Sequence, residues 1–279
     1  MFKTHLCLAL SEQFKIPLAD QIRLFKQIGF DGFFSGWAPG CDIAGLRAVA
    51  DEEDMIFQSI HAPFTKMRDM WYPSDVTESA VAELIACLND CAENGVPLMV
   101  THAFIGFEDH EPTEFGLQNY ARVVAEAERL GVKIAFENTE GEEYLAALMN
   151  HFKDSPAVGF CWDTGHQMCY NHSTDMMALY GDRLLGTHIN DNLGCRDFGG
   201  KIFWHDDLHL LPFDGIADWH ANAAKIKACG FIGPLTFELN TGSKPNRHEN
   251  DPYGRMDLVD YLTQAYIRAC KVAALVQRA

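Results

Sequence analysis

Short apolar runs alternate with longer amphipathic stretches along the whole chain. The runs have the length and composition of buried strands, and the stretches between them carry apolar residues at helical spacing. We expect strands at residues 4–10, 32–36, 55–64, 97–104, 132–139, 158–166, 183–191 and 233–240. We expect helices at residues 17–29, 42–54, 74–94, 115–130, 219–230 and about 256–277.

Local signals at the predicted helix ends support this division. Pro17 is suited to the first turn of a helix, and Gly29 to its end. Asp42 and Asp218 are each placed to cap the helix that follows. The helices therefore begin and end where the apolar pattern changes.

Eight strands with helices between them, over about 250 residues, are typical of a (β/α)8 TIM barrel. A doubly wound sheet is the competing arrangement, and it usually carries a glycine-rich turn after its first strand. The segment "LALSEQFK" after the first predicted strand has no glycine. We predict an α/β fold in which residues 1–279 form a single TIM-barrel domain.

Composition narrows the classes of partner. The formal net charge is −17, from 22 basic and 39 acidic residues, so a nucleic-acid partner is disfavoured. The nine cysteines include no CxxC pair and mostly lie in apolar runs, which indicates a reducing compartment. No leader pattern and no apolar window of about 20 residues is present, so we expect a soluble, cytoplasmic protein without a membrane partner.

Polar residues follow the apolar runs at the ends of six successive strands. In TIM barrels the carboxyl ends of the strands meet at one mouth, where active sites are built. These end residues are His61, His102, Glu137, Asp163 with His166 just beyond, His188 and Glu238. The chemistry is therefore expected at the C-terminal mouth of the barrel.

Each of these residues alone has an ordinary structural explanation, such as a hydrogen-bonded histidine or a helix-capping carboxylate. Together, Glu137, Asp163 and Glu238 would place three negative charges in a partly dry cavity. A divalent metal removes that conflict. The mixture of carboxylate and imidazole ligands suits Zn, Mn or Co best, with Mg and Fe as alternatives.

Two further segments could add to the mouth. Asp207 and His209 lie two residues apart in the loop after the seventh strand, either as extra ligands or as part of a solvated loop. Residues 61–75 are a candidate lid or a rigid loop. We expect two or three aromatic side chains to stack on substrate, from the set Trp37, Phe64, Trp71, Phe104, Phe107, Trp162 and Trp204.

Several motifs together resemble a known family. They are "SIHAPF", "FCWDTGH", "GTHIND", "DLHLLPFDGIADW" and "LTFELN", in this order on successive predicted strands and loops. The chain is similar, over nearly its whole length, to the xylose isomerase-like TIM-barrel superfamily. That superfamily includes ketohexose 3-epimerases, other sugar isomerases and apurinic endonucleases of the endonuclease-four type.

By this resemblance, Glu137, Asp163, His188 and Glu238 would bind one divalent metal. Glu137 and Glu238 would also be catalytic, since they would transfer a proton at the carbon next to a metal-bound carbonyl. His166 would contact substrate, and Arg196 is the nearest candidate for the epimerases' substrate-binding arginine. The resemblance thus implies an isomerase or epimerase of a small carbohydrate or carbohydrate derivative. Neither the sugar, its phosphorylation nor the oligomeric state follows, and a homo-oligomer is compatible with this fold.

The endonuclease branch implies a different activity, three-zinc cleavage of a phosphodiester. Ala103-Phe104 replaces the Pro-Gly expected there after His102. Few basic residues occupy the predicted mouth loops, namely Lys66, Arg68, Arg196, Lys201, Lys244 and Arg247. Yet its larger ligand set has a counterpart at every position. These are His61, His102, Glu137, Asp163, His166, His188, Asp207, His209 and Glu238. A lyase or dehydratase acting on polyols or keto acids, and a non-catalytic metal-binding barrel, remain further alternatives.

Overall fold

The computed structural model describes residues 4–108, 111–172, 174–197 and 201–279. The strands are β1 (Leu6–Ala9), β2 (Gly32–Gly36), β3 (Ile56–His61), β4 (Leu98–His102), β5 (Lys133–Glu137), β6 (Val158–Asp163), β7 (Leu184–His188) and β8 (Leu235–Phe237). The helices are α1 (Leu18–Ile28), α2 (Ile43–Glu52), α3 (Met67–Trp71), α4 (Thr77–Glu93), α5 (Glu114–Leu130), α6 (Glu142–His151), α7 (Thr164–Cys169), α8 (Met176–Tyr180), α9 (Trp219–Ala228), α10 (Asp251–Gly254) and α11 (Leu258–Arg278).

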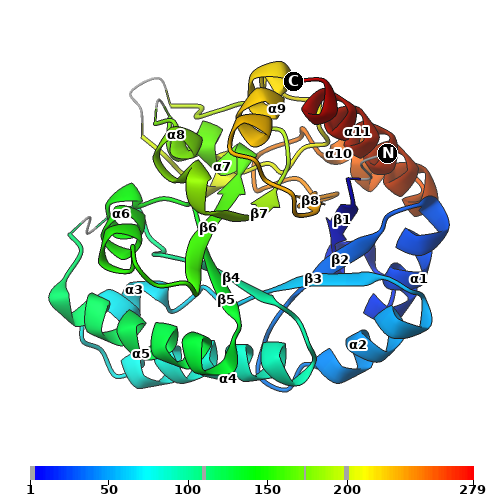
Figure 1. The fold of residues 1–279 in the computed structure, drawn as a ribbon. Coiled ribbons are helices and arrows are strands. Elements are labelled where there is room, and N and C mark those ends of the chain that lie inside the picture. The colour runs from blue at the N-terminus through cyan, green and yellow to red at the C-terminus, as the bar shows by residue number, and fades with distance from the viewer. Residues whose placement is uncertain (1–3, 109–110, 173, 198–200) are drawn as a thin grey trace.

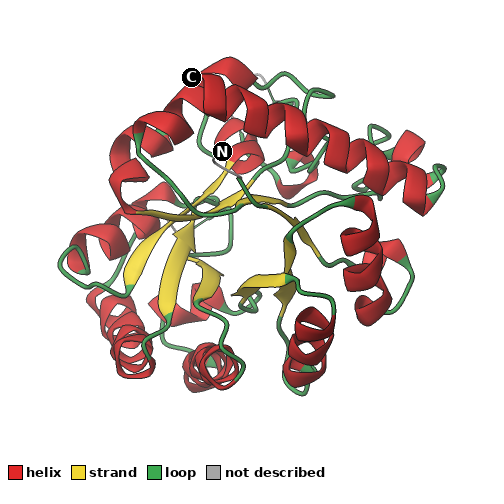
Figure 2. Ribbon diagram, turned by 45° about the vertical axis from the view of Figure 1, so that its right-hand side comes forward, coloured by secondary structure: helices red, strands yellow, loops and turns green. Residues whose placement is uncertain are grey.

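The strands form one eight-stranded sheet in the order β7-β6-β5-β4-β3-β2-β1-β8, and the ladders from β7 to β8 in this order are parallel. Figure 1 looks into the ring of strands and shows the helices around it. The turned view of Figure 2 shows the long C-terminal helix α11 lying across the outside of the barrel. The predicted TIM barrel is confirmed, and the doubly wound alternative is wrong.

The ring closes through a short seam between β7 and β8. Ile189 and Phe237 form an isolated parallel bridge there. The Ile189 amide donates to the Thr236 carbonyl at 2.8 Å, and the Glu238 amide donates to the Ile189 carbonyl at 3.2 Å. The side chain of Thr187 extends the seam, because its Oγ1 accepts from the Thr236 amide at 3.0 Å. This seam places His188 and Glu238 side by side.

Every predicted strand contains an observed one, but several predicted ends are wrong. The sixth strand ends at Asp163, because residues 164–166 begin helix α7. Asp163 itself caps that helix, with its Oδ1 accepting from the His166 amide at 2.7 Å. The third strand likewise ends at His61. The apolar pattern of the sequence predicted where the strands lie. Their exact ends depend on the turns and helix caps that follow, such as the cap made by Asp163.

The segment of residues 61–75 is held by buried contacts. Met67, Met70 and Trp71 of α3 are fully buried. The Trp71 indole donates to the Ala103 carbonyl at 2.7 Å, and Asn119 donates to the Met70 carbonyl at 2.8 Å. Of the two predicted alternatives, these contacts support the rigid loop.

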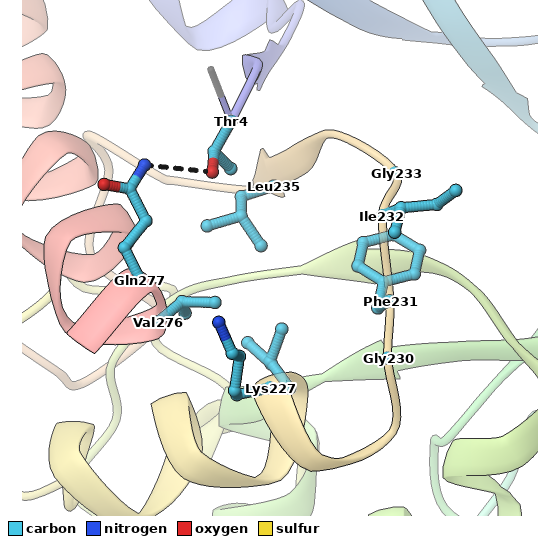
Figure 3. Close-up of a pocket in the computed structure, with 10 residues that line it drawn as sticks. Thr4, Lys227, Gly230, Phe231, Ile232, Gly233, Leu235, Val276 and Gln277 are labelled. Atoms are coloured by element: carbon cyan, nitrogen blue, oxygen red, sulfur yellow. Dashed lines mark hydrogen bonds between the residues drawn. The ribbon is translucent and has the colours of Figure 1, made fainter. Parts of the chain in front are cut away.

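The opposite end of the barrel carries a pocket of about 560 Å³ between the starts of β1 and β8 and the ends of α9 and α11 (Figure 3). Lys227 is the charged residue of its lining, and Gln277 donates to Thr4 across it at 3.4 Å. This pocket contains none of the predicted site residues. Within the described part of the chain, we find no helix that combines the length and hydropathy of a membrane span.

The barrel seam can be tested with two threonines. Replacing Thr187 by Val should lower the free energy of unfolding by about 1–3 kcal/mol, because the buried Thr236 amide loses its acceptor. The control is Thr236→Val, since the buried Thr236 hydroxyl has no hydrogen-bond partner. Urea unfolding should show no loss of stability in that control. Equal losses in both variants would contradict the assigned role of Thr187.

Candidate metal centre

The Glu137 carboxylate, at the end of β5, is the centre of the site. It is fully buried and faces imidazoles from both sides. Its Oε1 lies 2.9 Å from His188 Nδ1 and 3.4 Å from His166 Nδ1. Its Oε2 lies 3.2 Å from His61 Nε2 and 3.5 Å from His102 Nε2. Residues predicted from four other strand ends thus converge on one carboxylate.

The polar side chains around Glu137 form three adjoining groups. Within each group, the potential ligand atoms lie within 4.8 Å of one another. The first group joins His61 and His102 to Glu137. The second, central group joins Glu137 to Asp163, His188 and Glu238, with His188 Nδ1 3.1 Å from Glu238 Oε2. Glu137 belongs to both groups, so the two lie side by side.

The third group contains Asp163, His166 and His209. Asp207 lies against it, with Oδ1 2.9 Å from His209 Nε2 and 3.5 Å from His166 Nε2. Asp163 is shared between the second and third groups, as Glu137 is between the first and second. All nine residues considered from the sequence therefore lie in or against one continuous cluster.

Electrostatics in the cluster are dominated by burial. Burial, together with Glu137 and Glu238, raises the pKa of Asp163 to about 6, although His166 and His209 oppose the shift. Burial also acts to raise the pKa of Glu137, but the facing histidines outweigh it and hold that pKa well below its usual range. The carboxylates are thus balanced by the positive charge of the imidazoles.

The histidines show the complementary shifts. Burial lowers the pKa of His209, but the carboxylates of Asp207 and Glu238 outweigh it and raise that pKa to about 9. Burial also acts to lower the pKa of His166, but Asp163 with Asp207 outweighs it. At His188, Cys161 with Glu137 outweighs the same effect of burial on the pKa. Both pKa values are raised well above the ordinary value. A proton held on these imidazoles would have to leave before they could bind a divalent cation.

The donor chemistry fits a divalent metal. Carboxylate oxygens and imidazole nitrogens are the ligands that Zn, Mn and Co accept, and no thiolate takes part in the three groups. Asp207 Oδ1 is buried without a hydrogen-bond partner although it faces two imidazole nitrogens. Donor atoms directed at one another in this way are what a metal-ligand set requires.

Asparagine side chains hold the Asp163 carboxylate in place. Asn190 Nδ2 donates to both Asp163 oxygens, at 3.1 and 2.9 Å. Asn138 Oδ1 accepts from the Asp163 amide at 2.8 Å. A Cβ on Gly165 would lie 1.9 Å from Asn190 Oδ1, so only glycine allows this approach. Neither asparagine was among the residues predicted for the site, although each directly follows or lies two residues beyond a predicted ligand, Glu137 and His188.

The loop that carries Asp207 and His209 is fixed by Asp191, which was also not predicted for the site. Asp191 exchanges backbone hydrogen bonds with Leu210 at 2.8 and 2.9 Å. Its buried carboxylate accepts from the amides of Phe213 and Ala217 and from the Trp219 indole, at 2.9, 3.0 and 2.9 Å. These contacts hold the loop in place beside the cluster, and metal binding by Asp207 and His209 stays a prediction.

Most basic residues expected at the mouth are engaged by acidic neighbours. Lys66 pairs with Glu83 at 2.6 Å, and Lys244 pairs with Asp207 at 3.2 Å. The buried guanidinium of Arg247 contacts Asp206 and Glu249. Arg196 is exposed, and its Nε lies 3.8 Å from Asp206. Substrate binding by Arg196 stays a prediction.

The aromatic residues divide into two sets. Trp71, Phe104 and Trp162 are fully buried, so they pack the core. Phe64 stacks on His102 with ring centroids 4.5 Å apart, and Trp204 lies under the Lys244 ammonium at 5.6 Å. Aromatic surface is therefore available at the mouth from the exposed set.

The chain matches the family model described as "Xylose isomerase-like TIM barrel" over residues 22–260. This match covers well over half of the 279 residues. The chain therefore belongs to this family, as its motifs predicted.

Two curated relatives match parts of the chain. An uncharacterised Sinorhizobium fredii protein, y4fM, is 37% identical over 113 residues, which are 38% of this chain and 33% of that protein. A probable endonuclease 4 of Methanoculleus marisnigri is 26% identical over 161 residues, 49% of this chain and 56% of that protein. The chain thus spans between about a third and just over half the length of these relatives.

Solved structures share the fold over nearly the whole chain. The IolI protein with a bound zinc atom matches with a TM-score of 0.75 and 18% identity, over 98% of each chain. The D-psicose 3-epimerase of Clostridium cellulolyticum, solved with D-tagatose, matches with a TM-score of 0.74 and 15% identity, over 98% of this chain and 99% of that one. At these identities the likeness concerns the fold.

Metal binding should depend on the outer partner of Asp163. Replacing Asn190 by Ala removes both donors to the Asp163 carboxylate and should weaken metal binding about 10- to 100-fold. Titration calorimetry of chelator-treated protein with Zn²⁺ measures the change. Asn222→Ala, on α9, is the matched control and should bind as the parent does. Unchanged affinity in Asn190→Ala would contradict this role.

Metal binding should also release protons. Groups whose pKa is raised above 7, such as His209 at about 9, are protonated at pH 7 and must lose their protons to become ligands. The apparent affinity should therefore rise with pH, and the number of protons released should fall as pH increases through about 9. Calorimetry in two buffers of different ionisation enthalpy counts these protons. A pH-independent affinity between pH 6 and 9 would contradict the assignment.

Proposed function

We propose that this protein is a metal-dependent isomerase or epimerase of a small carbohydrate or carbohydrate derivative. The observation that carries the proposal is the position of two carboxylates on one imidazole. Glu137 and Glu238 lie 2.9 and 3.1 Å from His188 Nδ1. Two carboxylates at a single centre can serve two faces of one reacting carbon, which proton removal and return require.

In this proposal Glu137, Asp163, His188 and Glu238 hold the metal, in agreement with the central ligand group. A bound divalent cation would act as a Lewis acid on a carbonyl beside the reacting carbon. Metal identity follows from the ligands only as far as Zn, Mn or Co over Mg and Fe.

The two glutamates differ in access. Glu238 is partly exposed and lines a pocket at the mouth, whereas Glu137 is fully buried among histidines. We assign the first proton removal to Glu238, because it is the glutamate that lines this pocket. Burial acts to raise the pKa of Glu238, but His188 and His209 outweigh it and lower that pKa. Glu137 would return a proton from the other side.

His166 fits a ligand better than a substrate contact. Its Nδ1 lies 3.0 Å from the Asn138 carbonyl and its Nε2 lies 3.5 Å from Asp207. Because both nitrogens already face protein groups, we propose that His166 acts within the third ligand group. The exposed ring of Trp204 is better placed to meet substrate.

A second function, phosphodiester cleavage, is favoured by one observation: the three adjoining ligand groups could hold three metals. A phosphodiesterase of nucleic acid would need free cations along the mouth. Lys66, Lys244 and Arg247 are instead engaged by carboxylates. We therefore place the isomerase first. A lyase or dehydratase would share the first proton removal and differ in its product.

The proposal is tested by proton exchange. In deuterated water, metal-loaded protein should exchange the proton beside the carbonyl of a ketohexose, which NMR detects as loss of its signal. Glu238→Gln should reduce the rate about 100- to 10,000-fold, with metal partly retained by elemental analysis. The surface variant Glu126→Gln, on α5, should exchange as the parent does.

The outcomes separate the two functions. Nicking of an abasic duplex, with affinity falling steeply as salt increases, would favour the phosphodiesterase. About three metals per chain without sugar exchange would point the same way. Exchange that persists in Glu238→Gln would contradict the role given to that residue.

A further inference from the structure

A second pocket lies against the metal centre, at the carboxyl ends of β1, β2 and β3. Its volume is about 220 Å³, and Glu238 and His61 form part of its wall. Pockets for drug-sized ligands usually have about 300–1,000 Å³, so this one suits a smaller group. Its contact with Glu238 places it where the proposed proton transfer occurs.

Aromatic rings connect this pocket to the metal ligands. Phe34 lines the pocket and stacks on His188, with ring centroids 4.6 Å apart and planes 11° apart. Phe64 lines it as well and stacks on His102 at 4.5 Å and 17°. A group in this pocket would therefore lie next to a substrate carbon at the ligand cluster.

Most side chains of the wall are apolar, and its two side-chain N–H donors already have partners. Among the lining residues, the side-chain N–H donors belong to His61 and Trp37. His61 Nδ1 lies 2.8 Å from the Ala62 carbonyl and its Nε2 faces Glu137 at 3.2 Å. The Trp37 indole donates to Asp90 at 2.5 Å. The side chains of the wall thus leave Glu238 as the polar contact.

This lining discriminates between a hydroxymethyl and a methyl group. Beside the apolar side chains a hydroxyl that leaves water finds no partner and could turn only to Glu238, which already faces His188. A methyl group in the same place gains from burial. Resting on the proposed function, we propose that the substrate is a deoxy sugar. Its methyl terminus lies among Leu10, Phe34, Ala62 and Phe64 while its carbonyl end faces the ligand cluster.

Matched sugar pairs test this inference. The probes are 6-deoxyfructose against fructose and 6-deoxytagatose against tagatose, each in both enantiomers. Proton exchange in deuterated water gives kcat/KM, and calorimetry with metal-loaded protein gives affinity without needing turnover. We expect at least one deoxy sugar to exceed its hydroxylated partner by about 10- to 100-fold in both quantities.

Gly36 offers a matched pair of variants. A Cβ at Gly36 would meet no heavy atom within 4 Å, and Gly36 lies two residues from Phe34 on the same face of β2. Gly36→Ser would therefore add a hydroxyl to the pocket without a clash, and Gly36→Ala would add the carbon alone. We expect Gly36→Ser to reduce the deoxy preference about tenfold and Gly36→Ala to keep it. Leu10→Asn, which changes another lining residue, should act like Gly36→Ser.

Each result decides one of the two proposals. Exchange without preference for the deoxy partner overturns the deoxy-sugar inference and leaves the isomerase intact. A deoxy preference in affinity without exchange supports the pocket and overturns the isomerase. If neither Gly36→Ser nor Leu10→Asn reduces the preference, the preference arises outside this pocket, and the role given to the pocket is overturned. Neither binding nor exchange with any probe overturns both.

Discussion

The structure depends on balancing buried negative charge at the mouth of the barrel. Glu137 and Asp163 are fully buried, Asp207 nearly so, and Glu238 is partly exposed beside them. Isolated carboxylates in such a place would be costly. Imidazoles from the neighbouring strands offset that cost, and the nearest oxygen–nitrogen separations of about 3 Å follow from it. The carboxylates and imidazoles that balance one another in this way are also the donors that could hold a divalent cation.

The residues around the cluster fix the positions of its charged side chains mainly through uncharged hydrogen-bonding groups. Asn190 and Asn138 fix Asp163 through neutral amides, and Asp191 fixes the loop of Asp207 through backbone donors. Neutral partners set the orientation of a ligand without competing with a metal for its charge. The buried ion pair between Arg247 and Asp206 neutralises the guanidinium charge, so Arg247 adds no free positive charge to the mouth.

The fold, and the residues that meet at the mouth, could be predicted from two regularities: the alternation of apolar runs with amphipathic stretches, and the common direction of the strands in a barrel. Apolar runs located the strands, and parallel strands in a barrel bring their carboxyl ends together, so His61, Glu137 and Glu238 could be grouped without coordinates. Their division into three groups depends on side-chain directions, which sequence spacing does not encode. The short helix α7 was missed because Asp163 ends a strand and caps a helix at once. The pocket beside Glu238 was missed because β1 and β2 end without a charged residue.

The seam between β7 and β8 has a consequence for the coupling of fold and site. The other neighbouring strands are joined by ladders, whereas this pair is joined by an isolated bridge with a few added bonds. His188 stands on one side of that seam and Glu238 on the other, 3.1 Å apart. A cation bound by both side chains would connect β7 to β8 at the one junction of the described strands that lacks a ladder. A cation that binds only when the barrel is closed also stabilises the closed barrel. Metal affinity and the stability of the seam between β7 and β8 would therefore be linked.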